Sequence, residues 1–294
     1  MNTIIYSVSV LGGLGLLFGI ILSLASKAFA VEVDPKVEEI RKVLPGANCG
    51  ACGFPGCDGL ANAIAKGTAA VNSCSVGGQP VSDKVGEIMG VNAETDEKMI
   101  ATVLCQGSDC KAKEKFKYEG IKDCRAANRI AGGSKACSYG CLGFGTCQTV
   151  CQFDAIDIID GIAVINKEKC TGCKQCIEIC PKNIIEMVPY EQRTVIKCYS
   201  NDPGKVVRKN CSIGCIGCGI CVKNCPFNAI TMENNLAKIN YEECYKNCEA
   251  CGICAEVCPT GAIWTDLTKV LENIEAKEKA KKEAKAKAKA KAKA

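Results

Sequence analysis

The chain has 294 residues and a formal net charge of +5; 26 of its residues are cysteine and none is histidine. The absence of histidine excludes Cys2His2 zinc fingers, Rieske centres, histidine-ligated haem and acid-base catalysis by histidine. Aromatic residues make up only 5% of the chain. A single large apolar core is therefore not expected, and metal or covalent cross-links are expected to hold the fold together.

An uncharged apolar segment opens the chain. Residues 3–26 carry no charged side chain, and about 24 residues of helix span roughly 36 Å, which is enough to cross a bilayer. A cleaved signal peptide is the alternative, since Ala28-Phe29-Ala30 is similar to a cleavage site, but no basic residue precedes the segment. Basic residues follow it, so the positive-inside rule predicts a single-pass anchor in the cell membrane with the rest of the chain in the cytoplasm.

Repeated cysteine runs organise the rest of the chain. From Cys137 onward, four runs end in a cysteine followed by similar sequences, QFDAI, PKNII, PFNAI and PTGAI. Two β-favouring segments, 155–165 and 229–239, contain Asp-Gly or Asn-Asn turns and are expected to be hairpins. The fold class is expected to be α+β. The expected parts are the anchor (1–30), a small cysteine-containing domain (31–75), a mixed helical linker region (76–136), module 1 (137–190), module 2 (198–265) and a Lys/Ala-rich tail (266–294).

Module 2 has the cysteine spacing of a bacterial two-cluster ferredoxin. The run Cys-x2-Cys-x2-Cys-x3-Cys-Pro begins at Cys215 and again at Cys248. In such ferredoxins three close thiolates bind one [4Fe-4S] cluster and the fourth binds the other cluster. Zinc also takes four thiolates but usually uses separated Cys-x2-Cys pairs, so the spacing favours iron-sulfur. The predicted ligand sets are Cys215, Cys218, Cys221 and Cys258 for one cluster and Cys225, Cys248, Cys251 and Cys254 for the other.

Module 1 combines one regular run, beginning at Cys170, with one irregular run, beginning at Cys137. In the irregular run the cysteines are unevenly spaced, and Gln152 stands where the other runs have proline. The same exchange of the fourth cysteine predicts two further [4Fe-4S] clusters. Their predicted ligand sets are Cys151, Cys170, Cys173 and Cys176 for one cluster and Cys137, Cys141, Cys147 and Cys180 for the other.

A fifth group of four cysteines precedes the modules: Cys49, Cys52, Cys57 and Cys74. The glycines in the motif NCGACGFPGC let the backbone curl closely around a bulky cofactor. Zinc is the alternative here, but the four other predicted [4Fe-4S] sites in the same chain favour a fifth [4Fe-4S] cluster. The predicted cofactors are thus five [4Fe-4S] clusters, with no catalytic side chain in the chain itself.

The remaining cysteines are expected to be buried structural thiols, with a sixth cluster or ligand exchange as the alternative; they are Cys105, Cys110, Cys124, Cys198, Cys211 and Cys244. Aligning the runs places Cys211 on Cys137 and Cys218 on Phe144. Cys211 therefore looks redundant: its replacement by serine is expected to leave the cluster count unchanged, whereas replacing Cys137 is expected to remove one cluster. Cys244 leads the last run in the same way, which leaves the choice between Cys244 and Cys248 open.

In its order of motifs the chain resembles the B subunits of the Rnf complexes. The resemblance rests on an apolar N-terminal helix followed by NCGACGFPGC, CSYGCLGFGTC, CTGCKQCIEICP, CSIGCIGCGICVKNCP and CGICAEVCP. The resemblance covers almost the whole chain. It implies a cytoplasmic entry point that takes electrons from reduced ferredoxin and passes them to other membrane and peripheral subunits of an ion-translocating ferredoxin:NAD+ oxidoreductase. The chain shows no G-x-G-x-x-G fingerprint, so flavin and NAD sites are expected in partner subunits.

Two other classes of protein share some of these features. One is a polyferredoxin that serves a different membrane-bound redox enzyme, such as a hydrogenase, and the other is a structural zinc or disulfide protein. Nucleic acid is not an expected partner. The tail, like Cys244, departs from what the resemblance leads us to expect. Residues 277–294 contain nine lysines and two glutamates, and the alternatives there are a solvated segment or an electrostatic tether.

Overall fold

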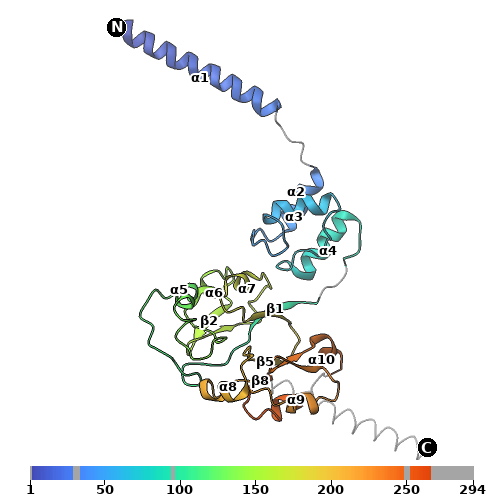
Figure 1. The fold of residues 1–294 in the computed structure, drawn as a ribbon. Helices are drawn as coiled ribbons and strands as arrows, with labels where there is room; N and C mark the ends of the chain where they lie inside the picture. The colour runs from blue at the N-terminus through green and yellow to red at the C-terminus, as the bar shows by residue number, and fades with distance from the viewer. Residues whose placement is uncertain (1, 29–33, 94–96, 248–251, 266–294) are drawn as a thin grey trace, which may run out of the picture.

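The computed structural model describes residues 2–28, 34–93, 97–247 and 252–265 (Figure 1). The Lys/Ala-rich tail, Cys248 and Cys251 lie outside the described residues. Helix α1, Asn2–Ala28, stands apart from the cysteine-rich body. Within the described residues it is the one helix long and apolar enough to cross a membrane, with a span at Val8–Ser26 whose mean hydropathy is 2.3. Its apolar side chains are exposed, as a lipid-facing helix requires.

Three helices form the small domain that follows: α2 (Pro35–Val43), α3 (Gly56–Ala65) and α4 (Gly78–Met89). Asp34 caps α2 by accepting a 2.9 Å hydrogen bond from the Lys36 N–H. The apolar faces of the three helices share one core built around Ile40, Leu60, Ile64 and Val85. Helix α4 falls in the region expected to be a linker, yet it closes this core.

Each module contains the expected hairpin. Strands β2 (Ile156–Ile159) and β3 (Ile162–Ile165) pair antiparallel in module 1, and β6 (Ile230–Glu233) and β7 (Leu236–Ile239) pair in the same way in module 2. Both residues of each turn have positive φ, 47° and 70° in Asp160-Gly161 and 47° and 64° in Asn234-Asn235. This is the two-residue turn that matches the twist of a hairpin, so the hairpin predictions are confirmed.

A second strand pair closes each module, and it is made of segments far apart in the chain. Strand β1 (Met99–Val103) pairs with β4 (Ile185–Pro189), and β5 (Thr194–Ile196) pairs with β8 (Ile263–Thr265). Strand β1 comes from the expected linker region, so part of that region completes module 1. In both pairs a cysteine stands two residues after the end of the earlier strand: Cys105 after β1 and Cys198 after β5.

Short helices carry the cysteine runs. Helices α6 (Thr146–Thr149), α7 (Gln175–Ile179), α9 (Ile220–Lys223) and α11 (Ile253–Glu256) each begin after a residue in the left-handed conformation. Each of the four contains one cysteine of its run. The left-handed residue turns the chain sharply between the preceding cysteine and the helix, so that a run of cysteines faces one centre. The remaining described helices are α5 (Cys124–Arg129), α8 (Gly204–Asn210) and α10 (Tyr241–Asn247).

A connecting segment, residues 111–115, joins the two modules. The Lys113 N–H donates to the Asn210 carbonyl at 2.8 Å, and the Lys113 carbonyl accepts from the Ala136 N–H at 2.7 Å. The neighbouring residues form two isolated antiparallel bridges, Ala112 with Cys211 and Glu114 with Lys135. The backbone just before Cys137 and around Cys211 is thereby tied to one shared strand-like segment.

Candidate metal centres

The first predicted set of module 2 surrounds one cavity. The cavity lies between α9 and β8, and its other walls are apolar side chains such as Ile196 and Met232; its cysteines are Cys215, Cys218, Cys221 and Cys258. Burial, together with the neighbouring thiols of Cys215 and Cys218, raises the pKa of the Cys221 thiol to about 11. These four side chains therefore face one cavity.

The regular set of module 1 surrounds a second cavity, lined by Cys151, Cys170, Cys173 and Cys176. Two backbone N–H groups donate to its sulfurs, Ala101 to Cys170 and Ala155 to Cys151, each at 3.4 Å. Burial raises the pKa of Cys176 to about 12, as do the adjacent cysteines. The hydroxyl Oγ1 of Thr171, on the wall of this cavity, is buried without a hydrogen-bond partner among the described residues. A sulfur-rich group in the cavity would supply the missing acceptor.

The cysteines of the small domain also lie close together. Burial raises the pKa of Cys74, and the thiols of the other three, Cys57, Cys52 and Cys49, raise it further. The side chain of Asn48 fixes the loop by accepting a 2.8 Å hydrogen bond from the Cys57 N–H. The predicted group of four is thus brought together at the start of α3.

The fourth predicted set differs from the structure at one position. The cavity beside α6 is lined by Cys124, Cys141, Cys147 and Cys180, and Cys137 is not among its walls. Burial raises the pKa of Cys147 to about 12, and the nearby thiols of Cys141, Cys124 and Cys180 add to the rise. The structure therefore places Cys124, expected to be a structural thiol, beside Cys141, Cys147 and Cys180 in this cavity, where the spacing predicted Cys137.

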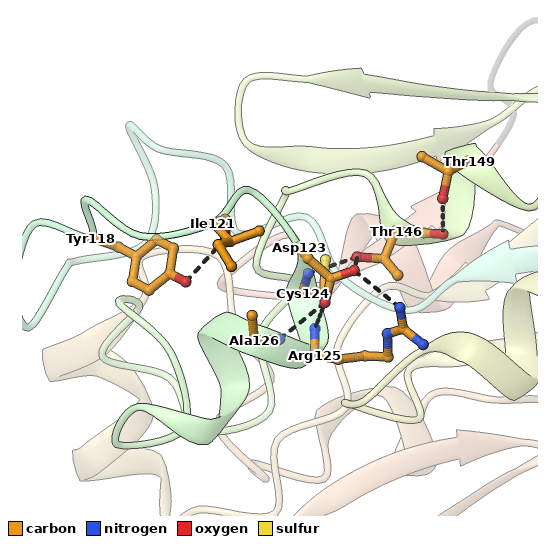
Figure 2. Close-up of polar contacts among 8 residues, drawn as sticks. All are labelled: Tyr118, Ile121, Asp123, Cys124, Arg125, Ala126, Thr146 and Thr149. Atoms are coloured by element: carbon orange, nitrogen blue, oxygen red, sulfur yellow. Dashed lines mark hydrogen bonds and ion pairs between the residues drawn. The ribbon is translucent and has the colours of Figure 1, made fainter.

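Hydrogen bonds between α5 and α6 place Cys124 there, as Figure 2 shows. Asp123 caps α5 by accepting from the N–H groups of Arg125 and Ala126, at 2.8 and 3.0 Å. The Cys124 N–H donates to Oγ1 of Thr146 at 2.6 Å, and that hydroxyl in turn donates to Asp123 at 3.2 Å. Because Thr146 immediately precedes Cys147, the network holds Cys124 and Cys147 on neighbouring segments.

An aromatic pair fills the position that a cysteine occupies in module 2. Phe144, which aligns with Cys218, lies with its ring centroid 5.1 Å from that of Tyr118. Tyr118 belongs to the loop that leads to α5, and its hydroxyl donates to the Ile121 carbonyl at 3.0 Å. The same loop thus packs on Phe144 and leads into Cys124. Cys124 stands in for the middle cysteine that the irregular run of module 1 lacks. Sequence spacing gave no signal for this exchange, because Cys124 lies outside the repeated run.

The last predicted set is only partly described. Cys225 and Cys254 pack in the core of module 2 around Ile230 and Ile263, whereas Cys248 and Cys251 lie outside the described residues. Cys244 is buried on α10, where its sulfur accepts from the Gln192 side-chain amide at 3.4 Å.

The other cysteines without a predicted role separate into two kinds. Cys110 is exposed, and its sulfur lies 3.3 Å from the Ser108 hydroxyl. Cys105, Cys198 and Cys211 line a further cavity together with Cys137.

The cysteine groups suit a metal cluster better than a single ion. A tetrahedral zinc ion needs four sulfurs at about 2.3 Å from one point. In the described part of the chain, no three Cys, Asp or Glu side chains converge tightly enough to hold one ion, although cysteines line several cavities in fours. Donor sets made only of cysteine, with backbone N–H groups donating to sulfur, are typical of iron-sulfur sites.

Protein-family models match the same regions. A model for an Fe-S cluster (FeS) matches residues 44–76, a 4Fe-4S binding domain matches residues 163–186, and a 4Fe-4S dicluster domain matches residues 214–262. The three matches cover the small domain, the regular run of module 1 and most of module 2.

Curated relatives match most of the chain. It is 52% identical over 243 residues to the B subunit of the Na+-translocating ferredoxin:NAD+ oxidoreductase complex of Acetobacterium woodii, covering 82% of this chain and 73% of the relative. It is 42% identical to the B subunit of the proton-translocating ferredoxin:NAD+ oxidoreductase complex of Clostridium ljungdahlii, with coverage of 82% and 85%. The B subunit of the ion-translocating oxidoreductase complex of Methanosarcina acetivorans is 41% identical, with coverage of 82% and 92%.

Proposed function

The chain belongs to the B subunits of the Rnf complexes, the ion-translocating ferredoxin:NAD+ oxidoreductases, and we propose that it accepts electrons from reduced ferredoxin and delivers them to partner subunits that reduce NAD+. Each bound [4Fe-4S] cluster would carry one electron at a time. The chain itself supplies thiolate ligands, N–H donors to sulfur and apolar walls. Flavin, NAD and the ion pathway are assigned to partner subunits.

One observation supports this proposal above the others: the cysteine groups adjoin one another. The side-chain amide of Gln175, on α7, donates to the Cys49 carbonyl at 2.7 Å, so the loop that carries Cys49 meets the helix that carries Cys176. The thiols of Cys173 and Cys49 also lie near enough to interact. On the other side, Cys176 lies near Cys147 of the next group. A series of neighbouring redox sites is what a relay needs, and a purely structural set of metal sites does not require it.

We assign the ligands by the cavities. Four sets are Cys49, Cys52, Cys57 and Cys74; Cys151, Cys170, Cys173 and Cys176; Cys124, Cys141, Cys147 and Cys180; and Cys215, Cys218, Cys221 and Cys258. The fifth, Cys225, Cys248, Cys251 and Cys254, rests on spacing and on the packing of Cys225 and Cys254. Together they make two tandem modules, each resembling a 2[4Fe-4S] ferredoxin, behind one small-domain site.

We also propose that α1 anchors the chain in a single pass and that the cysteine-rich body lies on the cytoplasmic side. Basic residues, among them Lys27, Lys36 and Arg41, follow the apolar span of α1. A soluble ferredoxin would then reach the small domain and the modules directly.

The test uses the full chain, purified anaerobically in detergent. Reduced ferredoxin added stepwise should bleach the visible absorbance and produce the electron paramagnetic resonance signals of reduced clusters, while NAD+ stays unreduced until partner subunits are added. A chain that contains iron but takes no electrons from ferredoxin would contradict the proposal. Co-purification with a hydrogenase instead of flavin-bearing membrane subunits would point to the other electron-transfer role.

A further inference from the structure

A cavity between the two modules has the same donor set as the assigned sites. Its cysteines are Cys105, Cys137, Cys198 and Cys211. It is similar in size to the cavities beside Cys221 and Cys176. The five clusters assigned from cysteine spacing leave this cavity without a role, and so do the five assigned from the other cavities.

The four cysteines enter the cavity in a two-fold pattern. Each module contributes one cysteine that follows a strand, Cys105 after β1 and Cys198 after β5. Each also contributes the first cysteine of a Cys-Ser-x-Gly-Cys motif, beginning at Cys137 in one and Cys211 in the other. The last cysteine of the motif turns to the module's own site, as Cys141 and Cys215 do. The bridge between Ala112 and Cys211 and the hydrogen bond from the Ala136 N–H to Lys113 hold the two motifs against one segment.

Two glycines lie beside these sulfurs. A Cβ added at Gly107 would lie 3.6 Å from Sγ of both Cys105 and Cys211. A Cβ added at Gly214 would lie 3.9 Å from Sγ of Cys198 and would overlap the side chain of Val207. The Gly107 N–H donates to Sγ of Cys105 at 3.4 Å, the same kind of N–H to sulfur contact found at Cys151 and Cys170.

The thiols of the four cysteines also influence one another. Burial raises the pKa of Cys137, and the thiols of Cys105 and Cys211 raise it further. Burial raises the pKa of Cys198 to about 12, and Cys137 is among the neighbours that add to the rise. The four side chains are therefore one group in space, although they come from four separate parts of the chain.

Two lysines give this cavity a positive wall. Lys135 is 3% exposed, and its ammonium donates to the carbonyls of Gly107 and Gly161, each at 2.7 Å. It also lies 3.8 Å from Oδ1 of the exposed Asp109. Lys197 is a second lining residue. A cluster bound by four thiolates has a net negative charge, which such buried cations stabilise.

We propose that Cys105, Cys137, Cys198 and Cys211 bind a sixth [4Fe-4S] cluster, held between the modules. The cavity adjoins the sites on both sides: Cys105 lies near Cys141, and Cys198 lies near Cys215. A cluster here would join the three sites of the small domain and module 1 to those of module 2. This part in the relay rests on the proposed function. The binding itself depends only on the four cysteines.

The decisive measurement is the cluster count of the full chain, purified anaerobically, by native mass spectrometry together with iron, sulfide and zinc analysis. The unmodified chain should carry six clusters, about 24 iron atoms, with zinc near absent. This count needs no variant and so does not depend on a variant's folding. Five clusters at full loading, or one zinc ion beside five clusters, would overturn the proposal.

Single variants locate the extra cluster. Cys105→Ala, Cys198→Ala and Cys211→Ala should each lose about four iron atoms per chain while the other clusters keep their electron paramagnetic resonance signals. Cys110→Ala, which removes an exposed cysteine five residues from Cys105, is the matched control and should lose none. Retention of full iron by the three variants would also overturn the proposal. Stepwise reduction by ferredoxin separates the proposed function from the proposed sixth cluster. If ferredoxin reduces a chain that carries only five clusters, the proposed function stands and the sixth cluster site is rejected.

Discussion

The backbone N–H of Cys124 donates a 2.6 Å hydrogen bond to Oγ1 of Thr146. This bond ties the start of α5, in the region before module 1, to the residue that precedes Cys147 (Figure 2). It explains how module 1 keeps a site of four cysteines although its irregular run lacks a middle cysteine. Cys137 lies instead at the cavity between the modules.

Replacing Cys124 tests the corrected ligand set. Cys124→Ala should lose one cluster, about four iron atoms per chain, because its thiol is one of the four that line the cavity beside α6. Iron analysis and native mass spectrometry of the anaerobic protein measure the loss. Cys110→Ala is the control, since Cys110 is exposed and outside that cavity. A full iron content in the Cys124→Ala chain would contradict this assignment and favour the ligand set expected from spacing, in which Cys137 takes the place of Cys124.

Phe144 offers a rescue of that loss. Because Phe144 aligns with Cys218, the double variant Cys124→Ala, Phe144→Cys should regain the cluster by giving module 1 the regular spacing of module 2. The same iron count and the return of the lost resonance measure it. Phe144→Ala in the Cys124→Ala background removes the same ring from Tyr118 without adding a thiol, and it should stay one cluster short. Recovery in both double variants would show that the ring, and not the thiol, matters.

Removing the Thr146 hydroxyl should destabilise module 1. Thr146→Val leaves the Cys124 N–H without its acceptor and removes one of the hydrogen bonds that Asp123 accepts, and an unsatisfied buried donor costs about 1–3 kcal/mol. Urea titration followed by the loss of visible cluster absorbance measures the change. Thr149→Val removes an exposed hydroxyl that bonds the Thr146 carbonyl and should cost within about 0.5 kcal/mol. Equal losses in the two variants would assign no special role to Thr146.

The charge of Lys135 should raise the reduction potentials of the nearest clusters. Lys135 lies near the thiols of Cys141 and Cys211, and a positive charge favours the more negative, reduced form of a cluster. Lys135→Met should therefore shift one or two midpoint potentials downward by tens of millivolts, given about 59 mV per tenfold change in a one-electron couple. Redox titration followed by electron paramagnetic resonance measures the shift. The exposed Lys117→Met, which removes the same charge, should leave every potential within error.

The tail should act through its charge alone. Residues 277–294 carry nine lysines and two glutamates, so deleting them should weaken binding to acidic ferredoxin or to anionic vesicles, most visibly at low salt where screening is least. Binding measured across a series of salt concentrations reports the change. A variant with the nine lysines replaced by glutamine keeps the length and should behave like the deletion. The same salt dependence with and without the tail would contradict this prediction.

Local signals in the sequence predicted several parts of the structure. The turns Asp160-Gly161 and Asn234-Asn235 favour positive φ, and both hairpins form where they stand. The regular runs place three cysteines within one loop and the start of a short helix, so their convergence needs few distant contacts, as in the group around Cys221. The apolar segment at the start of the chain forms one long helix for the same local reason.

Contacts between distant segments were not predictable in this way. Strand β1 joins module 1, and β5 pairs with β8, through partners far along the chain. Cys124 reaches its cavity through Thr146, and Cys105 and Cys198 reach theirs through the strands that precede them. No spacing rule in one sequence records which strands will pair, so the destinations of these cysteines stayed open.

The sequence alone determined the kind of chemistry. With cysteine abundant, histidine absent and the runs regular, iron-sulfur binding follows from donor type and spacing. The tertiary structure decided which thiols share a cavity, because a cluster site depends on where side chains meet in space and not on where they stand in the chain. Cys211 illustrates the difference: it is redundant within its own run, and it meets Cys105, Cys137 and Cys198 only after the two modules have packed together.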